Sequence, residues 1–296
     1  MVILKAKYYQ VSISITIALI LLGYLVNASV QDFLGLFLIF SAGLIHGAND
    51  IQLIQKKYRN THFNFFLILI ALYLTVVLLG GFLFFYFPKF GLFFFILFSG
   101  FHFGEQHWSS FLNQQKASMF LNKIGFTFYG LLIFSLLFII HIEEVKILIH
   151  QISGLTFTVN FFYWSTLILG IGFSVSAFFL PIDFRLFVKE SLALVFLCIL
   201  FANTSLLLSF SAYFVFWHSI PSINDQILYL NDEMSTTSLK KYFKSSFIYW
   251  IMSLLGLFVF YFYFDIDSDY FIPLFFTFLA AITFPHTIVM GMLDFE

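Results

Sequence analysis

Five of the eight histidines lie within long apolar stretches of the sequence, where an ionisable side chain is costly and usually marks function. They are His46, His102, His107, His218 and His286. Imidazole nitrogens suit iron, zinc, copper or nickel. The single cysteine, Cys198, provides no thiolate cluster, which disfavours Cu(I) and iron–sulfur centres. We therefore expect a metal bound by histidine, with iron or zinc as the first candidate.

Two acidic residues follow these histidines at helical spacing. Asp50 is four residues after His46, and Glu105 is three residues after His102. Such spacings place two side chains on one helical face, so either acid could accept a hydrogen bond from an imidazole and orient it. The alternative is a partly solvated acid near the membrane interface.

Two prolines accompany the other candidates. Pro221 follows His218 by three residues, and Pro285 directly precedes His286. A proline distorts a helix and frees backbone groups, which is tolerated in a membrane only where protein or water satisfies them. Pro221 therefore predicts a locally irregular helix beside His218.

The elements that carry these residues must be transmembrane helices. The chain has 296 residues, of which 61% are hydrophobic and 10% are charged, with a mean hydropathy of +0.98. Soluble domains carry roughly a quarter charged residues. The sequence predicts an all-α, polytopic integral membrane bundle, with residues 1–296 as a single domain. The net charge of −1 gives no excess of basic residues that would indicate binding to nucleic acid.

Cutting the chain at its charged and turn-forming clusters predicts about ten transmembrane helices of roughly 20 residues each. They cover 9–28, 33–54, 63–87, 91–112, 123–141, 160–180, 188–203, 206–222, 246–264 and 271–292. The span 188–203 is short, and it could form one bent hairpin with the next span.

The basic residues predict the orientation of the bundle. Twelve of the 14 Lys and Arg residues fall on one side of this topology, and only Lys89 and Lys146 fall on the other. The twelve are Lys5, Lys7, Lys56, Lys57, Arg59, Lys116, Lys123, Arg185, Lys189, Lys240, Lys241 and Lys244. By the positive-inside rule both termini are cytoplasmic, and the opposite loops carry acids such as Asp265, Asp267 and Asp269. The first span is retained rather than cleaved as a signal peptide.

In this topology the histidine-bearing helices all run from outside to inside. His46, His102, His218 and His286 then lie in the cytoplasmic halves of four different helices, at similar depth. Each histidine taken alone is more often a hydrogen-bond partner between helices. Four at one level indicate a common site. His62 falls in a predicted loop, His141 and His150 lie at the outer face, and all three are expected to be wetted.

Two polar segments complete the prediction. Residues 224–244 are expected to form a cytoplasmic loop. The stretch 141–158 alternates charge with Ile and Leu; an ordinary loop is favoured there over an interfacial helix.

Four short motifs carry a resemblance to a known family. They are His46-Gly-Ala-Asn-Asp50, His102-Phe-Gly-Glu-Gln, Trp217-His-Ser-Ile-Pro221 and Pro285-His-Thr. In this order, the set resembles the Brp/Blh family of membrane β-carotene dioxygenases, which are associated with rhodopsin systems. The resemblance spans the chain from His46 to His286.

The resemblance implies an enzyme that uses histidine-bound Fe(II) and O2 to cleave the central double bond of β-carotene into two retinals. It implies His46, His102 and His218 as iron ligands. It also implies a location in the inner (plasma) membrane, contact with lipid and possible delivery of retinal to a rhodopsin. Phe101, Phe103, Trp108, Phe216 and Trp217 are candidates to line a substrate channel.

Two positions depart from the family pattern. The pattern has a second histidine four residues after the Trp-His-Ser histidine, where this chain has Ser222, and an Asp after His-Phe-Gly, where this chain has His107. His286 or His107 could supply a fourth ligand, or iron could keep three histidines. We favour His286, because it comes from a separate helix, whereas His107 points about 140° away from His102 around their helix.

Three other classes remain open from the sequence. A diiron membrane desaturase or hydroxylase would use clustered histidine boxes with adjacent pairs, which this sequence lacks. A transporter would distribute His and acidic groups along a path through the membrane. A non-catalytic pigment-binding homologue would lack turnover.

Overall fold

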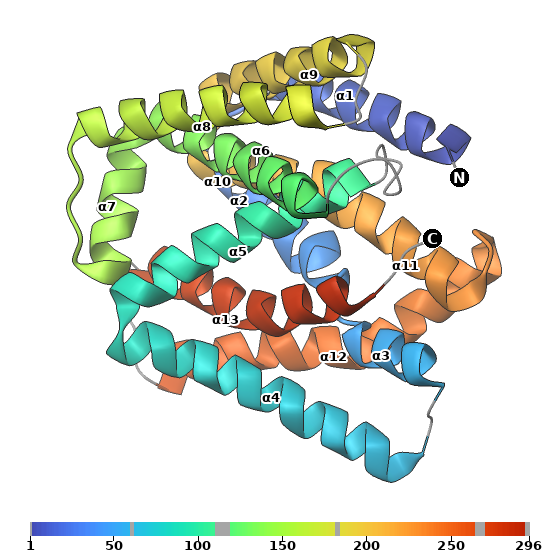
Figure 1. Cartoon of the computed structure of the whole chain (residues 1–296). Helices are drawn as coiled ribbons and strands as arrows, with labels where there is room; N and C mark the ends of the chain where they lie inside the picture. Colours follow the sequence, from blue (N-terminus) through green and yellow to red (C-terminus); the bar gives the residue numbers. More distant parts are fainter. Residues whose placement is uncertain (1, 60–61, 110–118, 181–183, 264–269, 294–296) are drawn as a thin grey trace. The chain divides into compact units, whose positions relative to one another are not determined.

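Figure 1 shows the computed structural model of the chain, which describes residues 2–59, 62–109, 119–180, 184–263 and 270–293. Regular structure within these ranges is helical, with no strand. The all-α prediction is confirmed. Lys116 and the predicted outer-loop acids Asp265, Asp267 and Asp269 lie outside the described residues.

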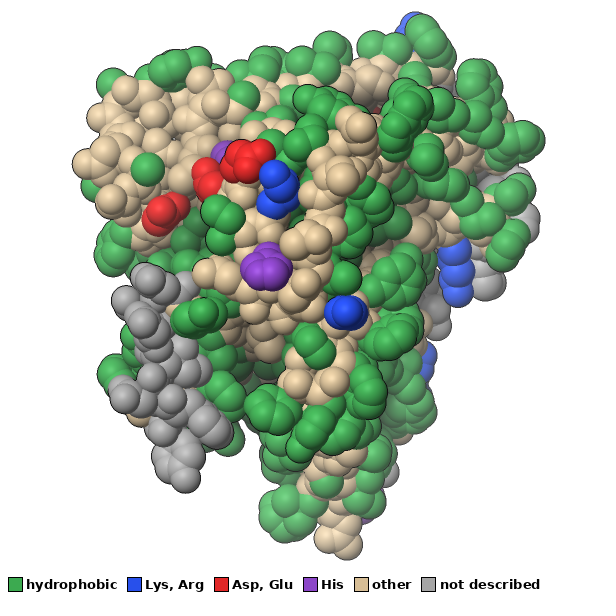
Figure 2. Space-filling model, turned by 90° about the vertical axis from the view of Figure 1, so that its left-hand side faces the viewer, with side chains coloured by type: hydrophobic (Ala, Val, Ile, Leu, Met, Phe, Trp, Pro, Cys, Tyr) green, Lys and Arg blue, Asp and Glu red, His purple; other side chains and the backbone are tan. Residues whose placement is uncertain are grey.

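Seven helices of the described chain are long and apolar enough to cross a membrane, so the chain has the composition of a polytopic membrane protein. They are Tyr8–Leu25, Phe63–Tyr86, Phe120–Ile140, Val159–Phe179, Leu206–Asn231, Thr236–Phe262 and Phe271–Met292. Figure 2 shows a surface dominated by hydrophobic side chains with few charged ones. The total of about ten spans, the cytoplasmic termini and the single domain stay predictions.

The described helices pack into two compact units. The first unit comprises Met1–Ile39, Ile96–Ile147 and Thr156–Pro221. The second unit comprises Phe40–Phe95, Leu148–Leu155 and Ser222–Glu296.

The first unit is built on side-by-side helices, with α6 against α8 and α1 against α9 (Figure 1). Its elements are α1 (Val2–Leu25), α2 (Ala28–Leu38), most of α5 (Pro88–Ser109), α6 (Met119–Ile140), α8 (Val159–Phe179), α9 (Phe184–Asn203), α10 (Leu206–Ala212) and the π-helix η3 (Tyr213–Ser219). The backbones of α5 and α6 are in contact, because a Cβ built on Gly104 would lie 1.9 Å from the Phe126 carbonyl oxygen. Only glycine permits this approach.

The second unit is built around α13, which packs against α4 and α12 (Figure 1). Its elements are the π-helix η1 (Ile39–Gly43), α3 (Asp50–Tyr58), α4 (Phe63–Tyr86), α11 (Ile220–Asn231), α12 (Thr236–Tyr263) and α13 (Phe271–Met292). An apolar cluster of Leu53, Val289, Met290 and Leu293 joins α3 to α13. This packing sets the position of α3 beside His286.

The two π-helices lie next to histidines. His218 is inside η3, and His46 follows η1 by three residues. A π-turn shifts the following side chains around the helix, and such turns are frequent at functional sites. Pro221 lies two residues after the end of η3, so the predicted distortion near this proline is confirmed.

The predicted span 33–54 is wrong as one continuous helix. The chain is helical to Ile45, turns through His46–Asn49 and resumes as α3 at Asp50. Gly47 lies inside this turn, and glycine and asparagine are poor formers of a helix interior. His46 and Asp50 are therefore not one turn apart on a regular helix.

The two predicted loops are largely helical. Most of 224–244 belongs to α11 and α12, because Ser235 accepts a hydrogen bond from the Ser238 amide (3.1 Å) and so starts α12. Ile142–Ser153 forms helix α7, which buries Val145 and Ile149 on its apolar side. Both loop predictions are wrong, because capping and amphipathic packing override polar composition.

Candidate functional site

His46 and His286 form a buried pair within the second unit. Their ring centroids are 4.6 Å apart and the ring planes are nearly perpendicular. His286 lies on α13 directly after Pro285, and His46 lies in the turn before α3. Gly47 packs beside the His286 ring, with space for a Cβ at 3.6 Å from Nδ1. Two distant sequence segments thus bring two imidazoles together.

Both imidazoles of this pair are oriented by hydrogen bonds at Nδ1. The His46 Nδ1 bonds to the Gly43 carbonyl, and the His286 Nδ1 lies 2.9 and 3.1 Å from the two Asp50 carboxylate oxygens. An ionised carboxylate only accepts, so His286 donates through Nδ1. A neutral imidazole that donates from Nδ1 carries its lone pair on Nε2, where a metal would bind. Asp50 orients His286, not its sequence neighbour His46.

Tyr73 extends the Asp50 interaction. Its hydroxyl, on α4, donates to Asp50 Oδ2 at 3.0 Å. Asp50 is 1% exposed, so this carboxylate depends on such partners to be tolerated in an apolar interior. Tyr73 was not among the residues predicted from the sequence; the signal that could have found it is a hydroxyl in the middle of an apolar span.

A buried polar network holds the turn that contains His46. Gln226 on α11 donates from Nε2 to the His46 carbonyl at 2.8 Å, and the Tyr242 hydroxyl donates to Gln226 Oε1 at 2.8 Å. Asn49 donates to the Tyr242 carbonyl at 3.2 Å. Ser222 is fully buried and accepts from Gln226 at 3.1 Å. Ser222 thus belongs to the network that supports His46.

His102 and His218 form a second buried pair, within the first unit. Their ring centroids are 4.8 Å apart at an interplanar angle of 80°. Phe103 lies 4.4 Å from the His218 ring, and Phe214 stacks on it at 5.8 Å. Phe103 and Phe214 thus shield this buried pair from water.

Trp217 anchors the segment that carries His218. Its indole N–H donates to Thr16 Oγ1 on α1 at 3.0 Å, and its ring meets Tyr9 at 5.5 Å. Trp217 is 4% exposed. A buried indole with its N–H satisfied fixes the end of η3 against α1.

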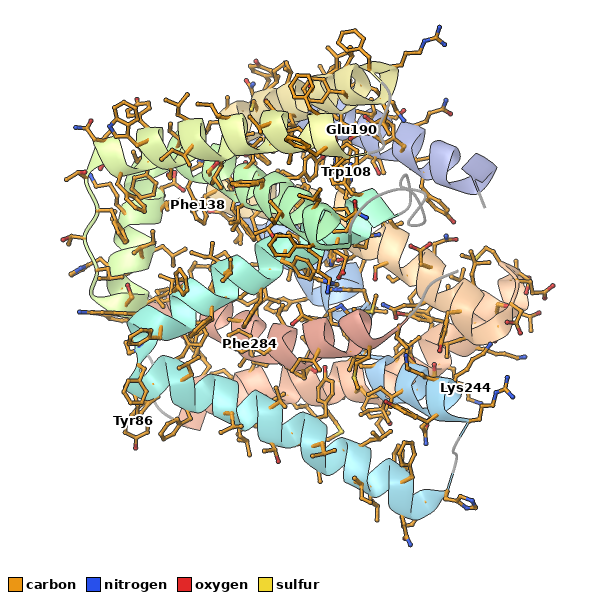
Figure 3. The ribbon with its side chains drawn as sticks, in the orientation of Figure 1. Tyr86, Trp108, Phe138, Glu190, Lys244 and Phe284 are labelled. Atoms are coloured by element: carbon orange, nitrogen blue, oxygen red, sulfur yellow. The ribbon has the colours of Figure 1, made fainter. Side chains whose placement is uncertain are left out.

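His107 has a partner that the sequence analysis missed. Its Nε2 lies 2.9 Å from Glu190 Oε2 on α9 and 3.3 Å from the Tyr129 hydroxyl on α6. Glu190 is fully buried, and Figure 3 labels it together with Trp108. The available signal was one acid inside the predicted span 188–203. Glu105, the acid nearer to His102, is half-buried on α5.

The three remaining histidines lie apart from these pairs. His62 and His150 are exposed, as predicted. The expectation that His141 is wetted is wrong: its side chain is 9% exposed and bonds to Ser209 Oγ at 3.1 Å. Burial lowers the pKa of His141, while nearby Glu144 opposes this shift.

The donor set fits a histidine-bound metal. His46, His218 and His286 are buried and each offers an imidazole nitrogen that could hold an ion. A carboxylate behind one imidazole is the usual arrangement around a metal-binding histidine. The fold and these residues define a class: a helical membrane protein with a candidate histidine metal centre.

Comparison with known proteins identifies the family. The family model described as beta-carotene 15,15'-dioxygenase matches residues 37–294, most of the chain and all four histidine motifs. The chain belongs to this family. Searches of curated proteins and of solved structures gave no significant match. Membership in a dioxygenase family disfavours the transporter and desaturase alternatives.

Proposed function

We propose that this protein cleaves the central double bond of β-carotene with O2 and releases two molecules of retinal. The observation that carries the proposal is the family match over residues 37–294. The buried histidine pairs support it, because a histidine-bound metal is one way to activate O2 for reaction with an alkene.

We further propose Fe(II) as the cofactor, bound by His46, His102, His218 and His286. When bound with open positions, Fe(II) supplies the activation of O2 that addition across an alkene requires. The hydrogen-bond partners of the two histidines favour His286 over His107 as the fourth ligand. Asp50 holds the His286 Nδ1 and directs its Nε2 lone pair to a metal, whereas the His107 Nε2 is engaged by Glu190.

The chain's own residues position the reactants and exclude water. Asp50 and the Gly43 carbonyl keep protons on the Nδ1 atoms of His286 and His46. Phe103 and Phe214 surround His218 with apolar surface. β-Carotene is a rigid apolar polyene that partitions into lipid, so it reaches an intramembrane site sideways from the bilayer. Selectivity for the central bond then depends on the length of the substrate channel. A channel that holds one half of the polyene places the central double bond at a fixed distance from the metal.

We place the protein in the cell's inner (plasma) membrane, with about ten spans and both termini cytoplasmic, and retinal passes to a rhodopsin partner. The charge asymmetry of the loops supports the orientation. Single-domain behaviour of residues 1–296 is part of the same proposal.

Expression in a β-carotene-producing bacterium tests the activity. We expect the cells to bleach and to accumulate retinal under oxygen. Folded protein in the membrane that leaves the pigment unchanged would contradict the proposal and favour a non-catalytic pigment-binding homologue.

A further inference from the structure

The buried pair His107–Glu190 lies outside the four proposed ligands, yet it is attached to the helix that carries one of them. Glu190 is 0% exposed and its Oε2 accepts from His107 Nε2 at 2.9 Å. A buried carboxylate is strongly unfavourable without a charged or hydrogen-bonding partner. Breaking the pair would remove the imidazole partner of this buried carboxyl group, so the hydrogen bond ties α5 to α9.

The rotation of α5 connects this pair to His102. Each residue turns about 100° around a helix, so His107 lies about 140° from His102 and Gly104 about 200° from it. His107 and Gly104 therefore share the face opposite His102. Gly104 packs directly on the α6 backbone at Phe126, and His107 is bound by α9 and by Tyr129 of α6. Contacts on one face of α5 thus fix the direction of the imidazole on the other.

The same cluster reaches the partner imidazole. Trp217 directly precedes His218, and its ring lies 6.5 Å from His107 and 5.5 Å from Tyr9. The Tyr9 hydroxyl donates to the carbonyl of Lys189, the residue before Glu190. All of these residues belong to the first unit. The cluster therefore contacts both segments that present the His102–His218 pair.

We propose that Glu190 is a positioning residue, which acts through His107 to set the rotation of α5 and so the geometry of the His102–His218 pair. The inference rests on the proposed histidine metal site. It assigns His107 and Glu190 to a clamp behind that site, with no contact to the metal or the substrate.

The test measures metal binding by the full-length protein purified in detergent, with Co(II) alone as a spectroscopic probe. Glu190→Gln, His107→Gln and the double variant are compared with Ser135→Ala, which removes a buried hydroxyl of α6 that bonds only locally to Leu132. Thermal unfolding of each variant is recorded in parallel.

We expect each clamp variant to bind Co(II) about 10-fold or more weakly, with altered d–d absorption at temperatures where the protein stays folded. The loss of Co(II) affinity in the double variant should be smaller than the sum of the losses in the two single variants. Two glutamines can re-form a hydrogen bond between α5 and α9. Ser135→Ala should bind Co(II) like the wild type.

Wild-type affinity and spectrum in Glu190→Gln would overturn the inference alone. Loss of metal only together with loss of the folded state would also overturn it, because it would show a purely structural role. Failure of the wild type to bind Co(II) or iron would instead overturn the proposed function, and this inference with it.

Discussion

The two histidine pairs are positioned by different means. In the second unit, His46 and His286 are each oriented by a hydrogen bond from Nδ1, to the Gly43 carbonyl and to the Asp50 carboxylate respectively. In the first unit, His102 and His218 pack among aromatic rings, and the helices that carry them are anchored at His107, five residues after His102, and at Trp217, directly before His218. Similar spacing between imidazoles can therefore come from polar orientation of the ring or from fixing the helix.

The difference has a consequence for substitutions. A ring oriented by hydrogen bonds is sensitive to loss of a polar partner and tolerant of small steric changes nearby. A ring positioned by helix packing is instead sensitive to steric changes and to loss of the contacts that anchor its helix. Substitutions at the two pairs should therefore have different effects.

Removing an imidazole from either pair should abolish activity. We expect His46→Ala, His102→Ala and His218→Ala to lose retinal formation and bound iron, and His286→Ala to do the same as the fourth ligand. The exposed His62 and His150 provide matched controls, whose Ala variants should keep both. Iron content and retinal are measured for each purified variant; equal tolerance in both groups would remove the site assignment.

Adding one methyl group beside each pair should separate the two units. In Gly104→Ala the new Cβ would lie 1.9 Å from the Phe126 carbonyl, so α5 must move away from α6, at a cost above the ~1–3 kcal/mol typical of overpacking. In Gly47→Ala the Cβ meets His286 Nδ1 at 3.6 Å, an ordinary contact. We expect severe loss of thermal stability and iron in the first variant and little in the second.

The control for both glycine variants is Gly81→Ala on α4, where a Cβ meets nothing within 4 Å. Similar melting temperatures for Gly104→Ala and Gly81→Ala would show that the close approach of α5 and α6 does not support the first pair.

Removing polar partners should affect the second pair instead. Asp50→Ala takes away the acceptor of the His286 N–H, and we expect about 10–100-fold weaker iron binding. Tyr73→Phe removes one hydrogen bond to Asp50 and should weaken iron binding only a few-fold, because such a bond contributes about 1 kcal/mol. Metal titration of the two variants checks the order; an equal or reversed order would contradict the Tyr73–Asp50–His286 arrangement.

The smallest effect concerns the pH dependence of the first unit. Burial lowers the pKa of His141, so the folded state favours the neutral ring. This contribution is fully present above the unfolded value of about 6.5 and is lost as the pH falls through the lowered pKa. Unfolding in detergent at pH 8 and pH 5.5 should show a smaller acid-induced loss of stability for His141→Gln than for the wild type. An identical loss in both would exclude His141 as the cause.

The sequence predicted the helices better than their interruptions. Apolar runs such as Phe63–Tyr86 determine a transmembrane helix by composition alone, since the bilayer leaves no alternative for the backbone. The turn at His46–Asn49 depends on tertiary hydrogen bonds from Gln226 and Tyr242, which local hydropathy does not report. The loop prediction for residues 224–244 was wrong for a related reason, because serine in this segment caps a helix.

The candidate residues were recognisable as residue types, but their partners were not. Histidines in apolar runs are conspicuous, and Asp50 was expected to orient an imidazole. Its actual partner, His286, is 236 positions away and is brought near by packing of α3 on α13. Glu190 was not predicted, because its hydrogen bond to His107, 83 positions away, forms only in the folded chain.

Metal analysis joined to product identification on one purified sample is the most direct test of the central claim. The protein, supplied with Fe(II), β-carotene and O2, should contain about one iron per chain and form retinal at twice the molar amount of carotene consumed. Intact protein that holds no iron and leaves β-carotene uncleaved would contradict the account.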